Sequence, residues 1–199
     1  MRLTKAVLGL LAIGACLTPD TVHAQSKTID VTKSTLKIRV FKSGVFSAFA
    51  HDHEIQATIE EGKIEAGTPD SSAHASVQLR VDSRKMRVLD PDTSADTRDQ
   101  IQHTMQSATV LDVEKFPEIS YQSTTVTSRG DAHWEVNGML NLRGKKQPVV
   151  VEVSLKDGHY RGSSSFKQSN FGINPISLAG GTVKVKDELK IEFDIVPAN

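Results

Sequence analysis

The feature that most constrains this chain is a strict alternation of apolar and polar side chains. Leu36, Ile38 and Val40 are apolar, whereas Lys37 and Arg39 between them are charged. Successive side chains of a β-strand point to opposite faces of the sheet. The alternation therefore predicts a strand with one apolar and one solvated face.

The same pattern recurs along most of the chain. It is found at 55–59, 75–81, 119–127, 134–142, 149–155, 160–166 and 189–195. Turn-forming residues separate these runs: Glu61-Gly62, Ser128-Arg129-Gly130-Asp131, Arg143-Gly144-Lys145-Lys146 and Asp157-Gly158. We therefore predict an all-β fold, an antiparallel eight-stranded β-barrel in which the last strand, 189–195, pairs with the first and closes the sheet.

One segment, 94–105, departs from the alternation. Ile101 and Met105 lie at a helical interval, Thr93 or Ser94 can cap the N-terminus, and Asp96 lies in the first turn. This predicts one short helix inserted between strands. Phe116-Pro117 then favours a return to extended backbone, because proline disfavours helical backbone in the residue before it.

The N-terminal segment has the order of a secretory signal peptide. Arg2 and Lys5 precede an apolar run at 6–17, and small side chains favour cleavage after Ala24. Lipidation at Cys16, the only cysteine, is the alternative. We predict a signal peptide at 1–24 and a single periplasmic domain at 25–199. No apolar run in this domain reaches the roughly 20 residues of a membrane-spanning helix.

Charge does not indicate a polyanionic or polycationic partner. Lys plus Arg and Asp plus Glu both number 24. Such a balance provides no basic field for nucleic acid, so we expect no nucleic-acid partner. Pairing of two barrels into a homodimer is left open.

Four stretches together resemble the YceI-like family. The most specific are 97–123, with its Leu111-Asp112-Val113 and Phe116-Pro117 segments, and 136–149, with its glycine-centred hairpin. Ile29-Asp30 and 186–195 also match in character. The resemblance implies a lipocalin-like periplasmic barrel that binds polyisoprenoid lipids. The chain departs from the family at His51-Asp52-His53 and at Leu111, where an aromatic residue is usual.

The inner face predicts a cavity rather than a solid core. Its small residues, Ala57, Ala75, Gly138, Gly162 and Ser164, favour an elongated void. The predicted apolar lining is Ile38, Val40, Phe46, Phe49, Ile55, Val77, Leu79, Tyr121, Trp134, Val136, Leu140, Val151, Phe166, Ile191 and Phe193. We expect a long-chain polyisoprenoid or a related lipid such as an isoprenoid quinone, held for storage or transport, and no other cofactor. A solid-core structural protein is the alternative.

His51 and His53 are the most suggestive polar residues. Two histidines two residues apart on a strand point to the same side. We predict that they contact the polar head group of the lipid; a metal site or metal-dependent enzyme is the alternative, although the other histidines show no matching pair spacing. No Gly-x-Ser-x-Gly motif is present. We therefore predict no catalytic residues, no resident metal and no enzymatic activity.

Overall fold

The computed structural model describes residues 25–43, 52–66, 75–178 and 183–198, which form one antiparallel sheet and one α-helix. The strands are β1 (Gln25–Thr28), β2 (Thr35–Ser43), β3 (His53–Ala57), β4 (Ile59–Ala66), β5 (Ser76–Asp82), β6 (Arg87–Val88), β7 (Glu118–Gly130), β8 (His133–Leu142), β9 (Lys145–Lys156), β10 (His159–Lys167), β11 (Ser177–Leu178) and β12 (Val183–Ile195). The predicted fold class, all-β with one inserted helix, is confirmed.

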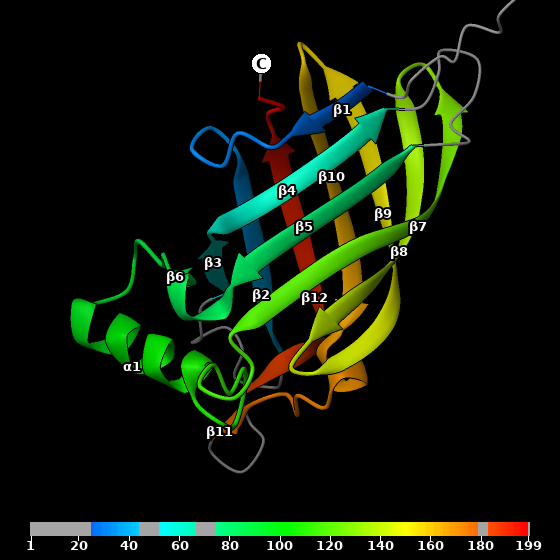
Figure 1. Cartoon of the computed structure of the whole chain (residues 1–199). Helices are drawn as coiled ribbons and strands as arrows, with labels where there is room; N and C mark the ends of the chain where they lie inside the picture. Colours follow the sequence, from blue (N-terminus) through cyan, green and yellow to red (C-terminus); the bar gives the residue numbers. More distant parts are fainter. Residues whose placement is uncertain (1–24, 44–51, 67–74, 179–182, 199) are drawn as a thin grey trace, which may run out of the picture.

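The sheet curls around an interior space (Figure 1). Its strand order is β1-β4-β5-β7-β8-β9-β10-β12-β2-β3-β6. One bent stretch of chain, β3 followed by β4, connects two distant parts of this strand order. Strand β3 pairs with β2, whereas β4 pairs with β5. Thr58 is the single residue between β3 and β4.

The strand count differs from the predicted eight. Within the described part of the chain the sheet contains twelve strands. The difference arises from the short strands β1, β6 and β11 and from the bend that divides one long strand into β3 and β4. The predicted pairing of the last strand with the first is confirmed, since Ile191 of β12 lies opposite Ile38 of β2. The predicted closure of the sheet is not found among the described residues, because the hydrogen-bonded order has two ends, β1 and β6.

The predicted turn at Glu61-Gly62 is wrong. Strand β4 runs through both residues, and Gly62 lies opposite Leu79. A Cβ atom on residue 62 would overlap the side chain of Ile29, so the glycine provides room for that buried residue rather than a change of direction. The direction changes instead at Thr58.

The predicted hairpins are confirmed. Asp157 and Gly158 have φ values of 54° and 78°, and they connect β9 to β10. Arg143 and Gly144 have φ values of 52° and 71° between β8 and β9. Positive φ at both central residues is the turn geometry whose twist suits paired antiparallel strands.

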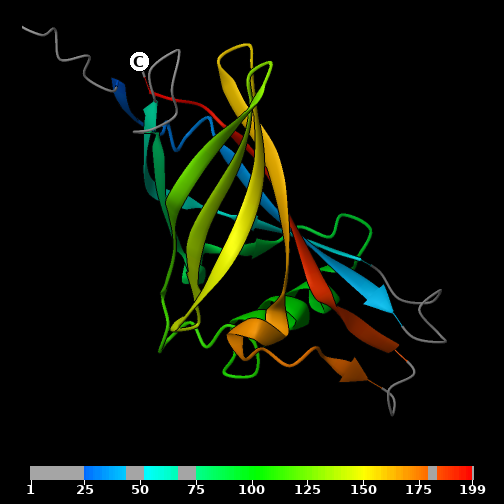
Figure 2. The same ribbon diagram turned by 90° about the vertical axis from the view of Figure 1, so that its right-hand side faces the viewer.

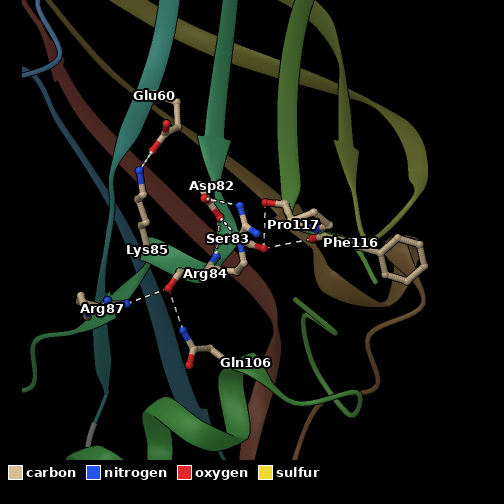
Figure 3. Close-up of polar contacts among 9 residues, drawn as sticks. All are labelled: Glu60, Asp82, Ser83, Arg84, Lys85, Arg87, Gln106, Phe116 and Pro117. Atoms are coloured by element: carbon tan, nitrogen blue, oxygen red, sulfur yellow. Dashed lines mark hydrogen bonds and ion pairs between the residues drawn. The ribbon is translucent and has the colours of Figure 1, made fainter. Parts of the chain in front are cut away.

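The inserted helix is α1 (Ala95–Gln106), and the Ser94 side chain caps it by accepting a hydrogen bond from the Thr97 backbone N–H. Figures 1 and 2 place α1 at one end of the curled sheet. The amide of Gln102 attaches it to the sheet by donating to Met86 O at 2.9 Å and accepting from Val88 N at 2.9 Å. Gln106 adds a bond to Arg84 O at 3.0 Å (Figure 3).

Ser83 joins this end of the sheet to the loop before β7. It begins η2 (Ser83–Lys85), and only 1% of the residue is exposed. Its hydroxyl lies 3.0 Å from Phe116 O and 3.1 Å from Pro117 O, and its backbone N–H donates to Pro117 O (Figure 3). The Phe116-Pro117 segment is thereby fixed against β5.

The buried core is concentrated at the same end. Phe171 and Ile173, in and after η3 (Gln168–Phe171), are 1% and 2% exposed. The rings of Phe166 and Phe171 meet edge to face, with centroids 5.3 Å apart. Leu111 and Val113, from the loop after α1, belong to the same cluster. We call four residues of this larger cluster, Phe171, Ile173, Leu111 and Val113, the base of the barrel.

Candidate ligand-binding cavity

A cavity of about 1440 Å³ occupies the interior of the curled sheet. Its wall includes every predicted lining residue that the structure describes: Ile38, Val40, Ile55, Val77, Leu79, Tyr121, Trp134, Val136, Leu140, Val151, Phe166, Ile191 and Phe193. Phe46 and Phe49 lie outside the described residues. The period-two alternation thus brings these side chains to one surface, and their contact with a ligand stays a prediction.

The two inner glycines do not enlarge the void as expected. A Cβ atom on residue 138 would overlap the ring of Tyr121, and one on residue 162 would meet Phe193 Cζ at 2.6 Å and overlap backbone as well. Aromatic rings from neighbouring strands therefore cover both glycines. Of the predicted small residues, Ala57, Ala75 and Ser164 do line the cavity.

Tyr121 is a partly buried residue of this wall. Its hydroxyl donates to Val136 O at 3.1 Å. Burial raises the pKa of Tyr121 to about 12, because the phenolate would lose hydration. On the same wall the Trp134 and Tyr160 rings have centroids 6.3 Å apart.

Helix α1 contributes a part of the wall that the sequence analysis missed. Thr97, Gln100, Ile101, Thr104 and Met105 all line the cavity. The spacing of Ile101 and Met105 indicated a buried helix face, but nothing in the sequence placed that face at one end of a cavity. This end of the cavity is therefore more polar than the strand-built wall.

His53 also lines the cavity and is held by a buried carboxylate. His53 Nδ1 lies 2.6 Å from Asp90 Oδ2, and the Asp90 side chain is only 2% exposed. The other oxygen, Asp90 Oδ1, accepts the Glu54 backbone N–H at 2.8 Å. The sequence analysis did not find Asp90, because it lies 37 residues from His53 and only pairing of β3 with β6 brings the two segments together.

The proposed partner of His53, His51, lies outside the described residues. Among the residues that the structure does describe, no three His, Cys, Asp or Glu side chains are grouped as a metal would require. Among the described residues, His53 is bonded to Asp90, a carboxylate that takes part in two hydrogen bonds.

The two ends of the cavity differ in charge. Lys42 and Lys184, on the paired ends of β2 and β12, line the end near α1. Glu65 of β4 and Asp131 of the β7–β8 turn line the opposite end. The cavity therefore has cationic side chains at one end and carboxylates at the other.

A curled antiparallel sheet around a large cavity with a mostly apolar wall places the chain among the small lipocalin-like β proteins. Sequence comparison identifies the group within that class. The YceI-like domain matches residues 27–197, and the chain belongs to the YceI-like family.

Individual relatives cover shorter segments. A UPF0312 protein of Pseudomonas savastanoi pv. phaseolicola is 37% identical over 79 residues, which are 35% of this chain and 41% of the relative. Protein YceI of Salmonella arizonae is 33% identical over 95 residues, or 48% of this chain and 45% of the relative. The chain thus spans less than half the length of the curated relatives it matches.

The fold is similar to that of a solved structure. Burkholderia cenocepacia BcnA superposes with a TM-score of 0.65 at 19% identity, over 86% of this chain and 99% of that one. At this identity the similarity supports the fold alone. Separately, no helix among the described residues is long and apolar enough to cross a membrane.

Proposed function

We propose that this protein binds the apolar chain of a polyisoprenoid or similar lipid inside the curled sheet, and that it acts as a binding protein rather than as an enzyme. The observation that carries the proposal is the cavity of about 1440 Å³ with its aliphatic and aromatic wall. Pockets for drug-sized ligands have about 300–1,000 Å³. The space therefore suits a ligand larger than a drug-sized molecule, and a solid-core protein is inconsistent with it.

Burial of a hydrocarbon chain supplies the binding free energy in this proposal. Each CH₂ group removed from water contributes about 0.8 kcal/mol. A prenyl chain of a few isoprene units can therefore bind without a charged contact. The N-terminal signal sequence supports a site of action in the periplasm, where such a protein stores or carries the lipid.

The helix end of the cavity is the proposed place for the head group. His53 is the histidine of the predicted pair that lines the cavity in the described structure. Its Nδ1 is held by Asp90, so the ring has a fixed orientation. Polar groups in apolar pockets are few, and they fix the orientation of the ligand.

Native mass spectrometry of the gently purified protein tests the proposal. We expect a co-purifying lipid whose mass corresponds to a prenyl chain with or without a head group. A protein that is repeatedly empty and also fails to take up geranylgeranyl methyl ether would contradict it. Trp134, the only tryptophan, lines the cavity and reports uptake through its fluorescence.

A cavity-filling variant locates the binding space. Val77→Phe with Val151→Phe places two rings in the void, and we expect at least a tenfold loss of affinity for geranylgeranyl methyl ether. Gln78→Phe with Glu152→Phe is the matched control, because these exposed neighbours face outward on the same strands. Equal affinities of the two variants would show that the probe binds elsewhere.

A further inference from the structure

The hydrogen bonds of Asp90 determine which nitrogen of His53 carries a hydrogen. Both carboxylate oxygens of Asp90 are engaged, Oδ1 by the Glu54 backbone N–H at 2.8 Å and Oδ2 by His53 Nδ1 at 2.6 Å. An ionised carboxylate can only accept hydrogen bonds. His53 Nδ1 must therefore be the donor of this short bond.

The second ring nitrogen of His53 then has a defined role. In neutral imidazole one nitrogen is a donor and the other an acceptor. With the hydrogen on Nδ1, Nε2 can only accept. Because His53 lines the cavity, a ligand at the helix end can lie next to its ring.

We infer that His53 Nε2 accepts a hydrogen bond from a hydroxyl group at the end of the bound chain, so that the cavity selects hydroxyl-terminated lipids. The inference rests on the proposed function, since the chain must first occupy the cavity. A hydroxyl donates to Nε2 while its oxygen still accepts from a neighbouring donor. An ether or a ketone carbonyl has no hydrogen to donate, so neutral His53 discriminates against both.

The surroundings of His53 offer one rival. Lys42 and Lys184 line the same end of the cavity, and ammonium groups favour an anionic head group such as a diphosphate. The two hypotheses differ in a measurable way. Recognition by Nε2 requires a donor hydrogen on the ligand, whereas recognition by the lysines requires negative charge.

Three probes with the same chain separate these head groups: geranylgeraniol, its methyl ether and its diphosphate. Binding is measured by Trp134 fluorescence at pH 8, and ¹⁵N NMR of the histidine rings establishes that His53 is neutral under these conditions. We expect the alcohol to bind roughly five- to tenfold more tightly than the ether, which is the effect of one neutral hydrogen bond. A diphosphate that binds more tightly than the alcohol would overturn the inference in favour of the lysines.

Asp90→Asn tests the tautomer directly. The oxygen of the introduced amide should stay on the Glu54 N–H, because that position needs an acceptor. The amide nitrogen then faces His53 Nδ1 and donates to it, which moves the ring hydrogen to Nε2. Nε2 becomes a donor, so we expect the alcohol to lose its advantage and the ether to bind at least as well.

His159 and Asp194 supply the matched control. His159 Nδ1 lies 2.7 Å from Asp194 Oδ1, but neither residue lines the cavity. Asp194→Asn should leave the alcohol-to-ether ratio as in the wild type. ¹⁵N NMR of the histidine rings should show the tautomer change of His53 only in the Asp90→Asn protein.

The outcomes separate this inference from the proposed function. If no probe binds to the wild-type protein, the proposed function fails. If alcohol and ether bind equally well, or if Asp90→Asn keeps the preference for the alcohol, only the head-group inference fails. Should Asp90→Asn not fold, His53→Phe replaces it, and we expect the alcohol and the ether to bind with the same affinity, because the acceptor nitrogen is gone.

Discussion

The base of this barrel and its body, by which we mean the strands around the cavity, have similar side chains but differ in how closely those side chains pack. In the base, Phe171 and Ile173 are almost completely buried against neighbouring side chains. In the body, Val77 and Val151 face the cavity and remain partly exposed. An apolar side chain that faces the interior can thus be either part of a closely packed core or part of a cavity wall.

Segments outside the strands make this difference. The base is filled by η3 and by the loop after α1, which supply Phe171, Leu111 and Val113. Figure 2 shows η3 and α1 together at this end of the strands. In the body, farther from α1, the opposite walls face each other across the cavity. Close packing should therefore determine stability at the base, and the enclosed volume should determine binding in the body.

The largest expected effect is at Phe171. Phe171→Ala removes a ring that is 1% exposed and in edge-to-face contact with Phe166. We expect the free energy of unfolding to fall by about 3–5 kcal/mol, because a cavity replaces the ring in a region that cannot collapse. Urea denaturation followed by circular dichroism measures this change.

Val151→Ala is the counterpart in the body. Its side chain already borders empty space, so we expect a loss of only about 1 kcal/mol. Equal losses for Phe171→Ala and Val151→Ala would mean that the body is as closely packed as the base, and the comparison would fail.

An effect smaller than that of Phe171→Ala is expected at Ser83, which joins β5 to the loop that enters the base. Ser83→Ala leaves the carbonyl of Phe116 without the hydroxyl that donates to it in a buried setting. We expect a loss of about 1–3 kcal/mol, the usual cost of one unpaired buried polar group. Ser165→Ala, at an exposed position of β10, should change stability by less than about 0.5 kcal/mol in the same urea experiment. If Ser83→Ala lowers the free energy of unfolding no more than Ser165→Ala does, the Ser83 hydroxyl does not anchor the base.

The sequence predicted which face of each strand is apolar, because alternation has a fixed period. Inward positions such as Ile38 and Ile191 follow directly from it. The bend at Thr58 and the close approach of Tyr121 to Gly138 were missed, since they depend on contacts between strands far apart in the chain. Asp90 was missed for the same reason. Periodicity predicts orientation, but not what fills the space that the side chains face.

The last expected effect appears only at high pH and concerns Tyr121, on the cavity wall. Burial raises its pKa from 10 to about 12 in the folded protein, whereas the unfolded chain retains the ordinary value. Folding stability from this group is therefore fully present below about pH 10 and is lost as the pH rises through about 12. Phenolate absorbance should show a late titration step that is lost in Tyr121→Phe. The step that remains belongs to Tyr160, the only other tyrosine, whose pKa burial also raises. Bound geranylgeraniol should shift the late step upward, because the ligand displaces water from the wall. A Tyr121 that titrates near 10, with or without ligand, would mean that water reaches this wall freely and that the body of the barrel is open rather than enclosed.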